Sequence, residues 1–357
     1  MENTNKRNQD ILRRQGEVLL PAIAYGDAAG LPVETRTAEY ITEHHGRIDK
    51  LIPTKENPFY GSTEHPGMWS DDTQLSLAVA KALIMAKGFS LDALVETHLE
   101  AYDETVEIIR KGKLVKRGWG GSTTGAMDKL HAGVDPTESG TLGGEGNGVL
   151  MKMAPLVYWQ VTTNTPMREA YTQLDQLTTM THDSELARIM TRVHADVLGY
   201  LLRTEQFNKT TFLSVIHASL ASHSFMYRGK STDTFKNIDD LLNIFLYLDP
   251  PRDNPKIDVP VTTEMILTHT DKRGFHAPYT LAMAYGAFLA HQGEFTPSVF
   301  EAVNLGGDTD SIASIVATMS AFKTKEPLLM PIDHQNIEDL DMIKSVSRQL
   351  AATALGN

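Results

Sequence analysis

Two short segments of the sequence combine aspartates with hydroxyl side chains directly before an apolar stretch. They read Ser-Asp-Asp-Thr at 70–73 and Asp-Thr-Asp-Ser at 308–311, and two glycines precede the second. One carboxylate at such a position can cap the following helix and offset its dipole. A second carboxylate beside it is repelled by the first unless a cation lies between them. Two such segments in one chain favour a site for a hard divalent ion, Mg²⁺ or Mn²⁺ before Ca²⁺, over capping alone.

Other motifs that use acidic or glycine-rich segments do not fit this sequence. An EF-hand beginning at Asp308 needs a glutamate at its last ligand position, where the sequence has Met319. There is no Gly-Lys-Ser/Thr motif of a P-loop and no His-Glu-x-x-His zinc helix. There is also no cysteine, which excludes disulfides, zinc–thiolate sites, iron–sulfur clusters and cysteine nucleophiles.

Two glycine-rich segments are candidates for binding a phosphate group. The segment at 143–148 reads Gly-Gly-Glu-Gly-Asn-Gly and precedes an apolar run, and the segment at 118–124 reads Gly-Trp-Gly-Gly-Ser-Thr-Thr. A glycine loop that enters a helix offers its backbone N–H groups to an anion. Flexible turns have the same composition, so each segment alone leaves both interpretations open.

Two single residues can take part in the chemistry. Glu34 follows an expected helix of small residues, and it can act as a general base or as a carboxylate next to a metal. His182 lies at the expected start of a helix, where it can contact a ligand. A solvated glutamate and an ordinary histidine are the competing interpretations.

Apolar residues recur with helical spacing along most of the chain. We therefore expect helices to position these residues. Apolar faces lie within 75–83, 91–102 and 186–201, and further helices are predicted near 11–30, 209–222, 237–248, 278–291, 309–322 and 334–354. Alternating patterns typical of strands are scarce, and the proline-rich segment 249–260 is expected to be a surface loop. The sequence therefore predicts an all-α fold.

Composition narrows the class of protein. The chain has 357 residues, of which 41% are hydrophobic, and a formal net charge of −12. That charge disfavours nucleic acid and anionic membranes as partners. No apolar stretch reaches the roughly 20 residues of a membrane span, and the polar start of the chain lacks the apolar core of a signal peptide. These features, with the absence of cysteine, are typical of a cytoplasmic protein.

The order of the motifs resembles that of the ADP-ribosylglycohydrolase family, which includes the dinitrogenase-reductase-activating glycohydrolases and the ADP-ribosylarginine hydrolases. The resemblance covers most of the chain, and the last segment is its most specific part. The matching segments are 26–34, 70–74, 118–123, 146–148, 153–156, 181–182 and 304–311.

This resemblance implies a compact, single-domain helical fold with a binuclear metal site, two Mg²⁺ or Mn²⁺ ions, at the bottom of a cleft. The metal ligands that it implies are Ser70, Asp71, Asp72, Asp308, Asp310 and Ser311. Both hydroxyl ligands are serines where the family usually has threonine. A serine hydroxyl can still coordinate a metal, although it is positioned less firmly because it lacks the β-branch.

The resemblance also assigns residues to substrate and to catalysis. The substrate contacts are expected to come from Gly146, Asn147, Gly148, His182 and Ser122. Asp72, Asp71 and Glu34 are the expected catalytic residues, and Glu34 matches a mobile glutamate of the family. The sequence Asp-Ser-Glu at 183–185 departs from the family, which usually has a proline-containing stretch there.

The expected activity is metal-dependent removal of ADP-ribose from modified protein side chains, with ADP-ribosylarginine as the first candidate. Hydrolysis of ADP-ribosylserine or of a small ADP-ribose derivative is the alternative. A further alternative is an immunity or binding protein that neutralises an ADP-ribosyltransferase toxin. Residues 1–15 are interpreted as a polar extension, either frayed or a partner-contacting arm, and residues 16–357 as the catalytic domain.

Overall fold

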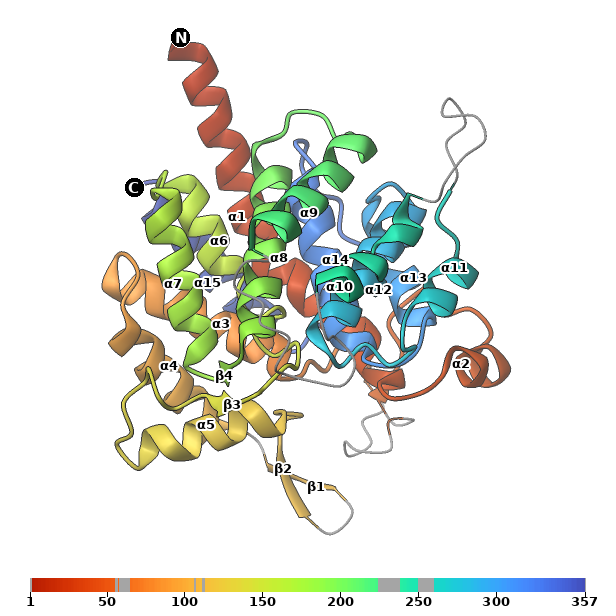
Figure 1. Cartoon of the computed structure of the whole chain (residues 1–357), viewed down its shortest axis with the longest axis horizontal. Helices are drawn as coiled ribbons and strands as arrows, with labels where there is room; N and C mark the ends of the chain where they lie inside the picture. Colours follow the sequence, from red (N-terminus) through yellow and green to blue (C-terminus); the bar gives the residue numbers. More distant parts are fainter. Residues whose placement is uncertain are drawn as a thin grey trace.

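The computed structural model describes residues 2–54, 57, 65–105, 107–110, 113–223, 238–249 and 260–356, without the side chains of 2–7, 107–110, 113–116 and 238. Helices dominate these residues, which confirms the predicted all-α fold (Figure 1). The α-helices are α1 (Glu2–Gly30), α2 (Ala38–His45), α3 (Asp71–Ala86), α4 (Leu91–Glu104), α5 (Gly121–His131), α6 (Ala154–Thr162), α7 (Met167–Thr179), α8 (Glu185–Arg203), α9 (Lys209–His223), α10 (Ile238–Asn243), α11 (Thr263–His269), α12 (Ala277–Ala290), α13 (Phe295–Asn304), α14 (Thr309–Lys323) and α15 (Leu340–Ala354).

The strands that the structure describes are short and form two small sheets. The hairpin pairs β1 (Glu107–Arg110) with β2 (Lys113–Lys116) in antiparallel fashion. The second sheet pairs β3 (Thr141–Leu142) with β4 (His182–Asp183) in parallel. This second pairing places the residues directly before the glycine-rich segment at 143–148 beside His182, a predicted substrate contact, although the two are far apart in sequence.

Two predicted helices are interrupted in the structure. The stretch predicted at 237–248 contains α10 and then a separate 3-10 helix, Leu246–Leu248. The stretch predicted at 334–354 is divided between a 3-10 helix, Ile332–Asn336, and α15, because Asp339 adopts a left-handed backbone conformation with φ of 54°. Most of the predicted loop at 249–260 lies outside the described residues.

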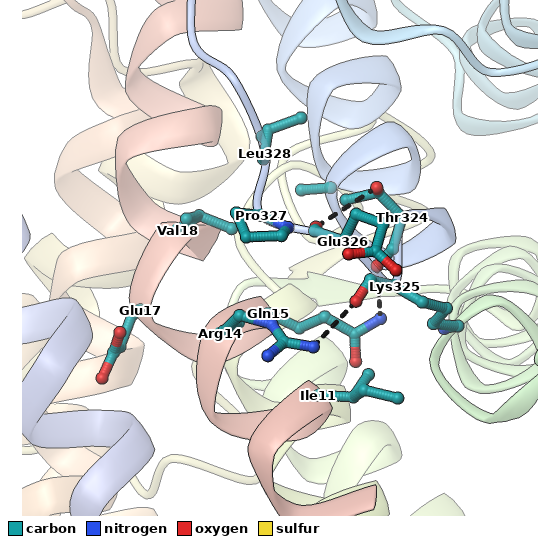
Figure 2. Close-up of a pocket in the computed structure, with 11 residues that line it drawn as sticks. Ile11, Arg14, Gln15, Glu17, Val18, Thr324, Lys325, Glu326, Pro327 and Leu328 are labelled. Carbon is teal, nitrogen blue, oxygen red and sulfur yellow. Dashed lines mark hydrogen bonds between the residues drawn. The ribbon is translucent and has the colours of Figure 1, made fainter. Parts of the chain in front are cut away.

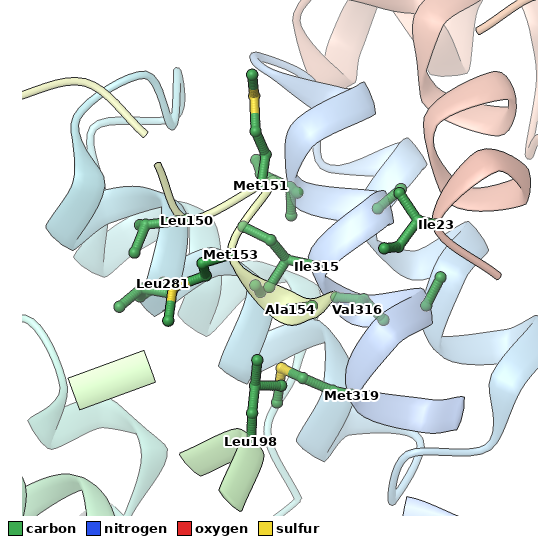
Figure 3. Packing of buried hydrophobic residues seen from close by; sticks show 14 of the residues in the cluster. Ile23, Leu150, Met151, Met153, Ala154, Leu198, Leu281, Ile315, Val316 and Met319 are labelled. Atoms are coloured by element: carbon green, nitrogen blue, oxygen red, sulfur yellow. The ribbon is translucent and has the colours of Figure 1, made fainter. Parts of the chain in front are cut away.

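The centre of the molecule is built from helices that are buried on all sides. Every residue of α14 from Thr309 to Phe322 is buried, and α12 is apolar around most of its circumference. Such helices have no polar face to turn to water, so they occupy the interior. Figure 3 shows Ile315, Val316 and Met319 of α14 packed with Met153 and Leu198 from other elements. The described helices therefore surround one continuous core, as in a single domain.

The α1–α14 contact is unusually close, and glycines permit it. A Cβ atom on Gly26 would lie 2.4 Å from the carbonyl oxygen of Ala313, and one on Gly30 would lie 2.2 Å from that of Thr309. Any larger residue would force the two helices apart. The contact brings the end of α1 directly against the start of α14, where the second aspartate segment lies.

The N-terminal residues continue α1 beyond the body of the protein (Figure 1). The helix is fixed near residue 15 at a pocket of about 250 Å³, shown in Figure 2. There the Gln15 amide donates to the Phe322 carbonyl at 2.6 Å, and the Arg14 guanidinium donates to the Lys325 carbonyl at 2.9 Å. The division of the chain at residue 15 stays a prediction, and the helix crosses it without a break.

Within the described residues, no helix combines the length and the apolar composition that a membrane crossing requires.

Candidate active site

The two aspartate segments lie at the N-termini of neighbouring helices. Ser70 is the N-cap of α3, and Asp308 is the N-cap of α14. The second segment is reached through Gly306 and Gly307, whose φ angles are 74° and 81°, a region that favours glycine. The Asp308 N–H donates to the carbonyl of Arg273 at 2.7 Å, which fixes the start of α14.

Hydrogen bonds from α14 hold Asp72 of α3. The hydroxyl of Ser311 donates to one carboxylate oxygen of Asp72 at 3.2 Å, and the hydroxyl of Ser314 donates to the other at 2.9 Å. The two segments, separated by more than half of the chain, therefore form one site. Ser314 lies one helical turn after Ser311, and its role was not predicted because only its distance from Asp72 in space reveals it.

Glu34 joins the second segment in an acidic cluster. Glu34, Asp308 and Asp310 each offer one carboxylate oxygen, and these oxygens all lie within 4.8 Å of one another. Glu34 was predicted as a base or a metal-adjacent carboxylate, and the structure places it where it can be a ligand. Oxygen donors from three carboxylates suit a hard divalent cation such as Mg²⁺ or Mn²⁺.

The electrostatics of the buried carboxylates also favour a cation. Burial, and then the charge of Asp310, raises the pKa of Asp71, Asp72 and Asp308 well above the usual range. Burial also raises the pKa of Asp310 itself. Carboxylates that are buried together resist ionisation unless a positive charge compensates them. The residues present therefore fit a divalent metal.

Asp27 is a further member of the site that the sequence analysis did not single out. It is fully buried in α1, and its carboxylate accepts hydrogen bonds from the Ser70 N–H at 2.9 Å and the Thr73 N–H at 3.0 Å. The Thr73 hydroxyl donates to the same carboxylate at 2.6 Å. Asp27 therefore positions the first turn of α3. An acidic residue among the small residues of a buried helix was the available signal.

A cleft of about 340 Å³ opens beside these carboxylates. Ser70 does not line it and is the buried cap of α3, where its hydroxyl accepts from the Asp72 N–H at 3.3 Å, and its role as a metal ligand stays a prediction. Trp119, Thr123, Met151 and Phe275 line it as well. All other predicted site residues line the cleft: Glu34, Asp71, Asp72, Ser122, Gly146, Asn147, Gly148, His182, Asp308, Asp310 and Ser311.

Asn147 connects the glycine loop to the acidic cluster. Its side-chain amide donates to Asp308 at 2.6 Å and to the carbonyl of Gly274 at 3.2 Å. The sequence predicted a substrate contact for Asn147, and the structure adds a contact with a candidate metal ligand. The amide orients one oxygen of Asp308 and leaves the other for a metal or for a neighbouring group.

His182 also lines the cleft and is 2% exposed. Its Nδ1 atom is 2.9 Å from the Thr181 hydroxyl. Burial, with the charge of Lys152 as a second cause, lowers the pKa of His182 to about 3. The ring is therefore neutral at physiological pH, and it can offer a hydrogen bond but not a positive charge.

Lys152 is fully buried behind the cleft and was not predicted. Burial lowers the pKa of its ammonium group to about 7, and the charge of Asp71 opposes this shift. Its Nζ atom is 3.4 Å from the Thr181 hydroxyl. No local pattern marks this residue, because one lysine between two methionines is typical of a solvated turn.

Comparison with known proteins identifies the family. The family model for ADP-ribosylglycohydrolase matches residues 15–323. The chain belongs to the ADP-ribosylglycohydrolase family. An uncharacterized protein of Archaeoglobus fulgidus is 23% identical over 304 residues, which are 84% of this chain and 85% of the relative. A solved ADP-ribosylglycohydrolase-related protein complex has a chain with the same fold, with a TM-score of 0.67, 22% identity, and coverage of 98% of this chain and 99% of that chain.

Membership in the ADP-ribosylglycohydrolase family connects the geometry with a reaction class, the hydrolysis of ADP-ribose linkages. ADP-ribosylglycohydrolases are generally metal-dependent, and the cluster of Glu34, Asp308 and Asp310 is the candidate metal site in this one.

Proposed function

We propose that this ADP-ribosylglycohydrolase is a metal-dependent enzyme that removes ADP-ribose from modified side chains of a protein substrate, with ADP-ribosylarginine as the substrate. The observation that carries the proposal is the wall of buried carboxylates along the cleft, formed by Asp71, Asp72, Asp308 and Asp310 together with Glu34. These five carboxylates exceed the charge of two divalent cations, so the wall stays acidic when metal is bound. The guanidinium of arginine is a cationic leaving group that such a wall attracts.

We propose a binuclear centre of two Mg²⁺ or Mn²⁺ ions held by Asp71, Asp72, Asp308, Asp310 and the Ser311 hydroxyl. Such ions supply Lewis acidity toward ribose hydroxyls and lower the pKa of a bound water. Ser70 was proposed as a ligand from the resemblance, but its hydroxyl is engaged at the α3 terminus. Its contribution to the centre is therefore expected to be the smallest.

The chain itself supplies the groups that handle protons and orient the substrate. Asp72, Asp71 and Glu34 line the cleft and can orient the attacking water or accept its proton. Cleavage at the anomeric carbon develops positive charge on the ribose, as in other glycosidic cleavages, and the carboxylates stabilise that charge. The glycine loop with Gly146 and Gly148, together with Ser122, is proposed to contact the ADP-ribose.

The linkage is tested with matched substrates. The protein, with Mg²⁺ or Mn²⁺, is incubated with an arginine-ADP-ribosylated and a serine-ADP-ribosylated protein, and released ADP-ribose is measured. Release from the arginine substrate is expected. Release from the serine substrate alone would contradict the arginine assignment and would favour the alternative linkage. The variants Asp72→Asn and Asp308→Asn serve as controls, because activity that persists in both would contradict the metal mechanism.

A binding role is a second candidate because α1 extends beyond the body of the protein. An arm of this kind can contact a partner such as an ADP-ribosyltransferase toxin. Gln15 and Arg14 fix the helix to the body, so a truncation that removes residues 1–10 leaves this anchor in place. Unchanged toxin binding and unchanged protection by the truncated protein would contradict the arm.

A further inference from the structure

Lys152, Thr181 and His182 form a buried chain that leads from the core to the wall of the cleft. The Nζ atom of Lys152 is 3.4 Å from the Thr181 hydroxyl oxygen, and that oxygen is 2.9 Å from Nδ1 of His182. Lys152 and Thr181 have no exposed surface, and His182 is 2% exposed. In the part of the chain that the structure describes, no other side chain shares these contacts.

The chemistry of the three groups decides where the protons lie. A lysine ammonium group can only donate, so the hydroxyl oxygen of Thr181 accepts from Lys152. The hydroxyl hydrogen of Thr181 is buried and needs an acceptor. Among the described residues, Nδ1 of His182 is the one acceptor within reach of that hydroxyl. Nδ1 must then be unprotonated, and a neutral ring carries its hydrogen on Nε2.

The Nε2 edge of the ring faces the glycine loop of the cleft. A Cβ atom on Gly148 would lie 3.2 Å from Nε2, and one on Gly146 would lie 3.7 Å from it. The absence of side chains at these two positions leaves the Nε2 edge accessible from the cleft. Burial, with the charge of Lys152 as a second cause, lowers the pKa of His182 to about 3, which keeps the ring neutral.

We propose that Lys152 is a positioning residue that acts through Thr181 to hold His182 in the neutral form protonated on Nε2, so that the ring donates a hydrogen bond to a ligand oxygen in the cleft. The opposite form, protonated on Nδ1, would present an acceptor and would reject a phosphate or carbonyl oxygen. The role of Lys152 is therefore to make Nε2 of His182 a hydrogen-bond donor toward the cleft. The proposal rests on the proposed function only for the identity of the ligand, ADP-ribose.

Nitrogen-15 NMR of the histidine side chains tests the proposal without any substrate. Spectra are recorded between the His182 pKa of about 3 and the Lys152 pKa of about 7, where the ring is neutral and the lysine is charged. The His182→Gln variant assigns the signal. In the wild-type protein we expect Nδ1 of His182 to be unprotonated and Nε2 to be protonated.

Paired variants then separate the positioning role from a general effect on folding. Thr181→Val removes the hydroxyl, so Nδ1 of His182 loses its donor and the form protonated on Nδ1 should dominate. Lys152→Met removes the donor to the Thr181 hydroxyl oxygen, so that oxygen can accept from Nδ1 and part of the population should carry the proton there. Thr181→Ser keeps the hydroxyl and should retain the wild-type form. Lys129→Met is the matched control, because Lys129 donates to the nearby Gly140 carbonyl at 3.0 Å and does not contact Thr181. The internal reference signal is that of His194, a buried histidine whose Nδ1 atom lies 3.3 Å from the Tyr285 hydroxyl.

The result is read in two steps. A wild-type His182 protonated on Nδ1 would overturn the proposal, as would an unchanged ring in a folded Lys152→Met variant. If Lys152→Met does not fold, Lys152→Arg replaces it and should retain the wild-type form. ADP-ribose should bind Lys152→Met about tenfold more weakly than wild type. A changed ring with unchanged ADP-ribose affinity would support the positioning role and contradict the ligand named by the proposed function.

Discussion

The two aspartate segments have similar sequences but different surroundings. In the first segment, Ser70 caps α3 with its hydroxyl, and the buried carboxylate of Asp27 fixes the turn from behind. In the second, Asp308 occupies the cap position of α14 but makes no side-chain cap hydrogen bond, and two glycines with positive φ bring the chain to it. The first segment is therefore held by side chains and the second mainly by its backbone. Asp308 makes no capping hydrogen bond, and Asp310 accepts one from the Ser311 N–H at 3.0 Å with a single carboxylate oxygen, so both keep a carboxylate oxygen for a metal.

The largest effect on activity and on metal affinity is expected when the second segment loses a carboxylate. Asp310→Asn keeps the shape of the side chain and removes one charge from the cluster with Glu34 and Asp308. We expect hydrolysis of the ADP-ribosylated substrate to fall by more than about a hundredfold, and metal affinity to fall with it. Isothermal titration with Mn²⁺ and an ADP-ribose release assay measure the two effects. Wild-type metal affinity in this variant would contradict the location of the site.

A variant of Asn147 tests whether metal binding by the second segment depends on a hydrogen bond from the glycine-rich segment at 143–148. Asn147→Ala removes the hydrogen bond of 2.6 Å to Asp308 without touching the cluster itself. Groups that orient metal ligands typically contribute about tenfold to hundredfold in metal affinity or activity. We expect a loss in that range, measured by titration with Mn²⁺. The control is Ser122→Ala, which changes another cleft residue, and equal affinity in both variants would refute the supporting role of Asn147.

Asp27, the residue of α1 that holds the first segment, predicts a pH dependence of stability in the metal-free protein. Burial, and then the charge of Asp310, raises the pKa of Asp27 from 3.8 to about 7. The folded protein then binds more protons than the unfolded protein between these values, so stability falls as pH rises from about 4 to about 7. The size of this effect is on the order of a few kcal/mol.

Urea unfolding at about pH 5 and about pH 7 measures this slope. Asp27→Asn cannot titrate, so its stability should decrease less between the two pH values, even if the lost charge changes stability at both. The comparison of slopes isolates the titration of Asp27 from its hydrogen bonds to α3. Equal slopes in the variant and the wild type would show that the proton is bound elsewhere.

Substitution of the two serines, one in each aspartate segment, is expected to have the smallest effects on stability and on metal affinity. Ser70→Ala removes a helix cap and should reduce the free energy of unfolding by about 1 kcal/mol, with little change in metal affinity. Ser311→Ala removes the contact of 3.2 Å with Asp72 and should instead weaken metal binding. Thermal unfolding measures the stability of both variants, and titration with Mn²⁺ measures their metal affinity. Similar metal affinities in the two variants would mean that the serines are equivalent.

The sequence predicted the parts of the site that are marked by local patterns. Helical periodicity and the clustering of aspartates are short-range signals, so α3, α14 and most of the cleft residues could be found in advance. Asp27 and Lys152 were missed because their roles depend on contacts between distant segments. Ser70 and Asp308 occupy the same position before a helix, and only the structure shows that the side chain of Ser70 caps its helix whereas that of Asp308 does not. The interruption of the last helix at Asp339 depends on a single left-handed residue.

The close contact between α1 and α14 has a consequence for how the protein is made. The hydroxyl of Thr309 donates to the carbonyl of Gly30 across a sequence separation of 279 residues. The halves of the acidic cluster, Glu34 and Asp308, are brought together by that contact. During synthesis the cluster cannot form until α14 has left the ribosome, and a topology of such long-range contacts folds slowly. The nascent chain therefore cannot assemble the candidate metal site before α14 has been synthesised.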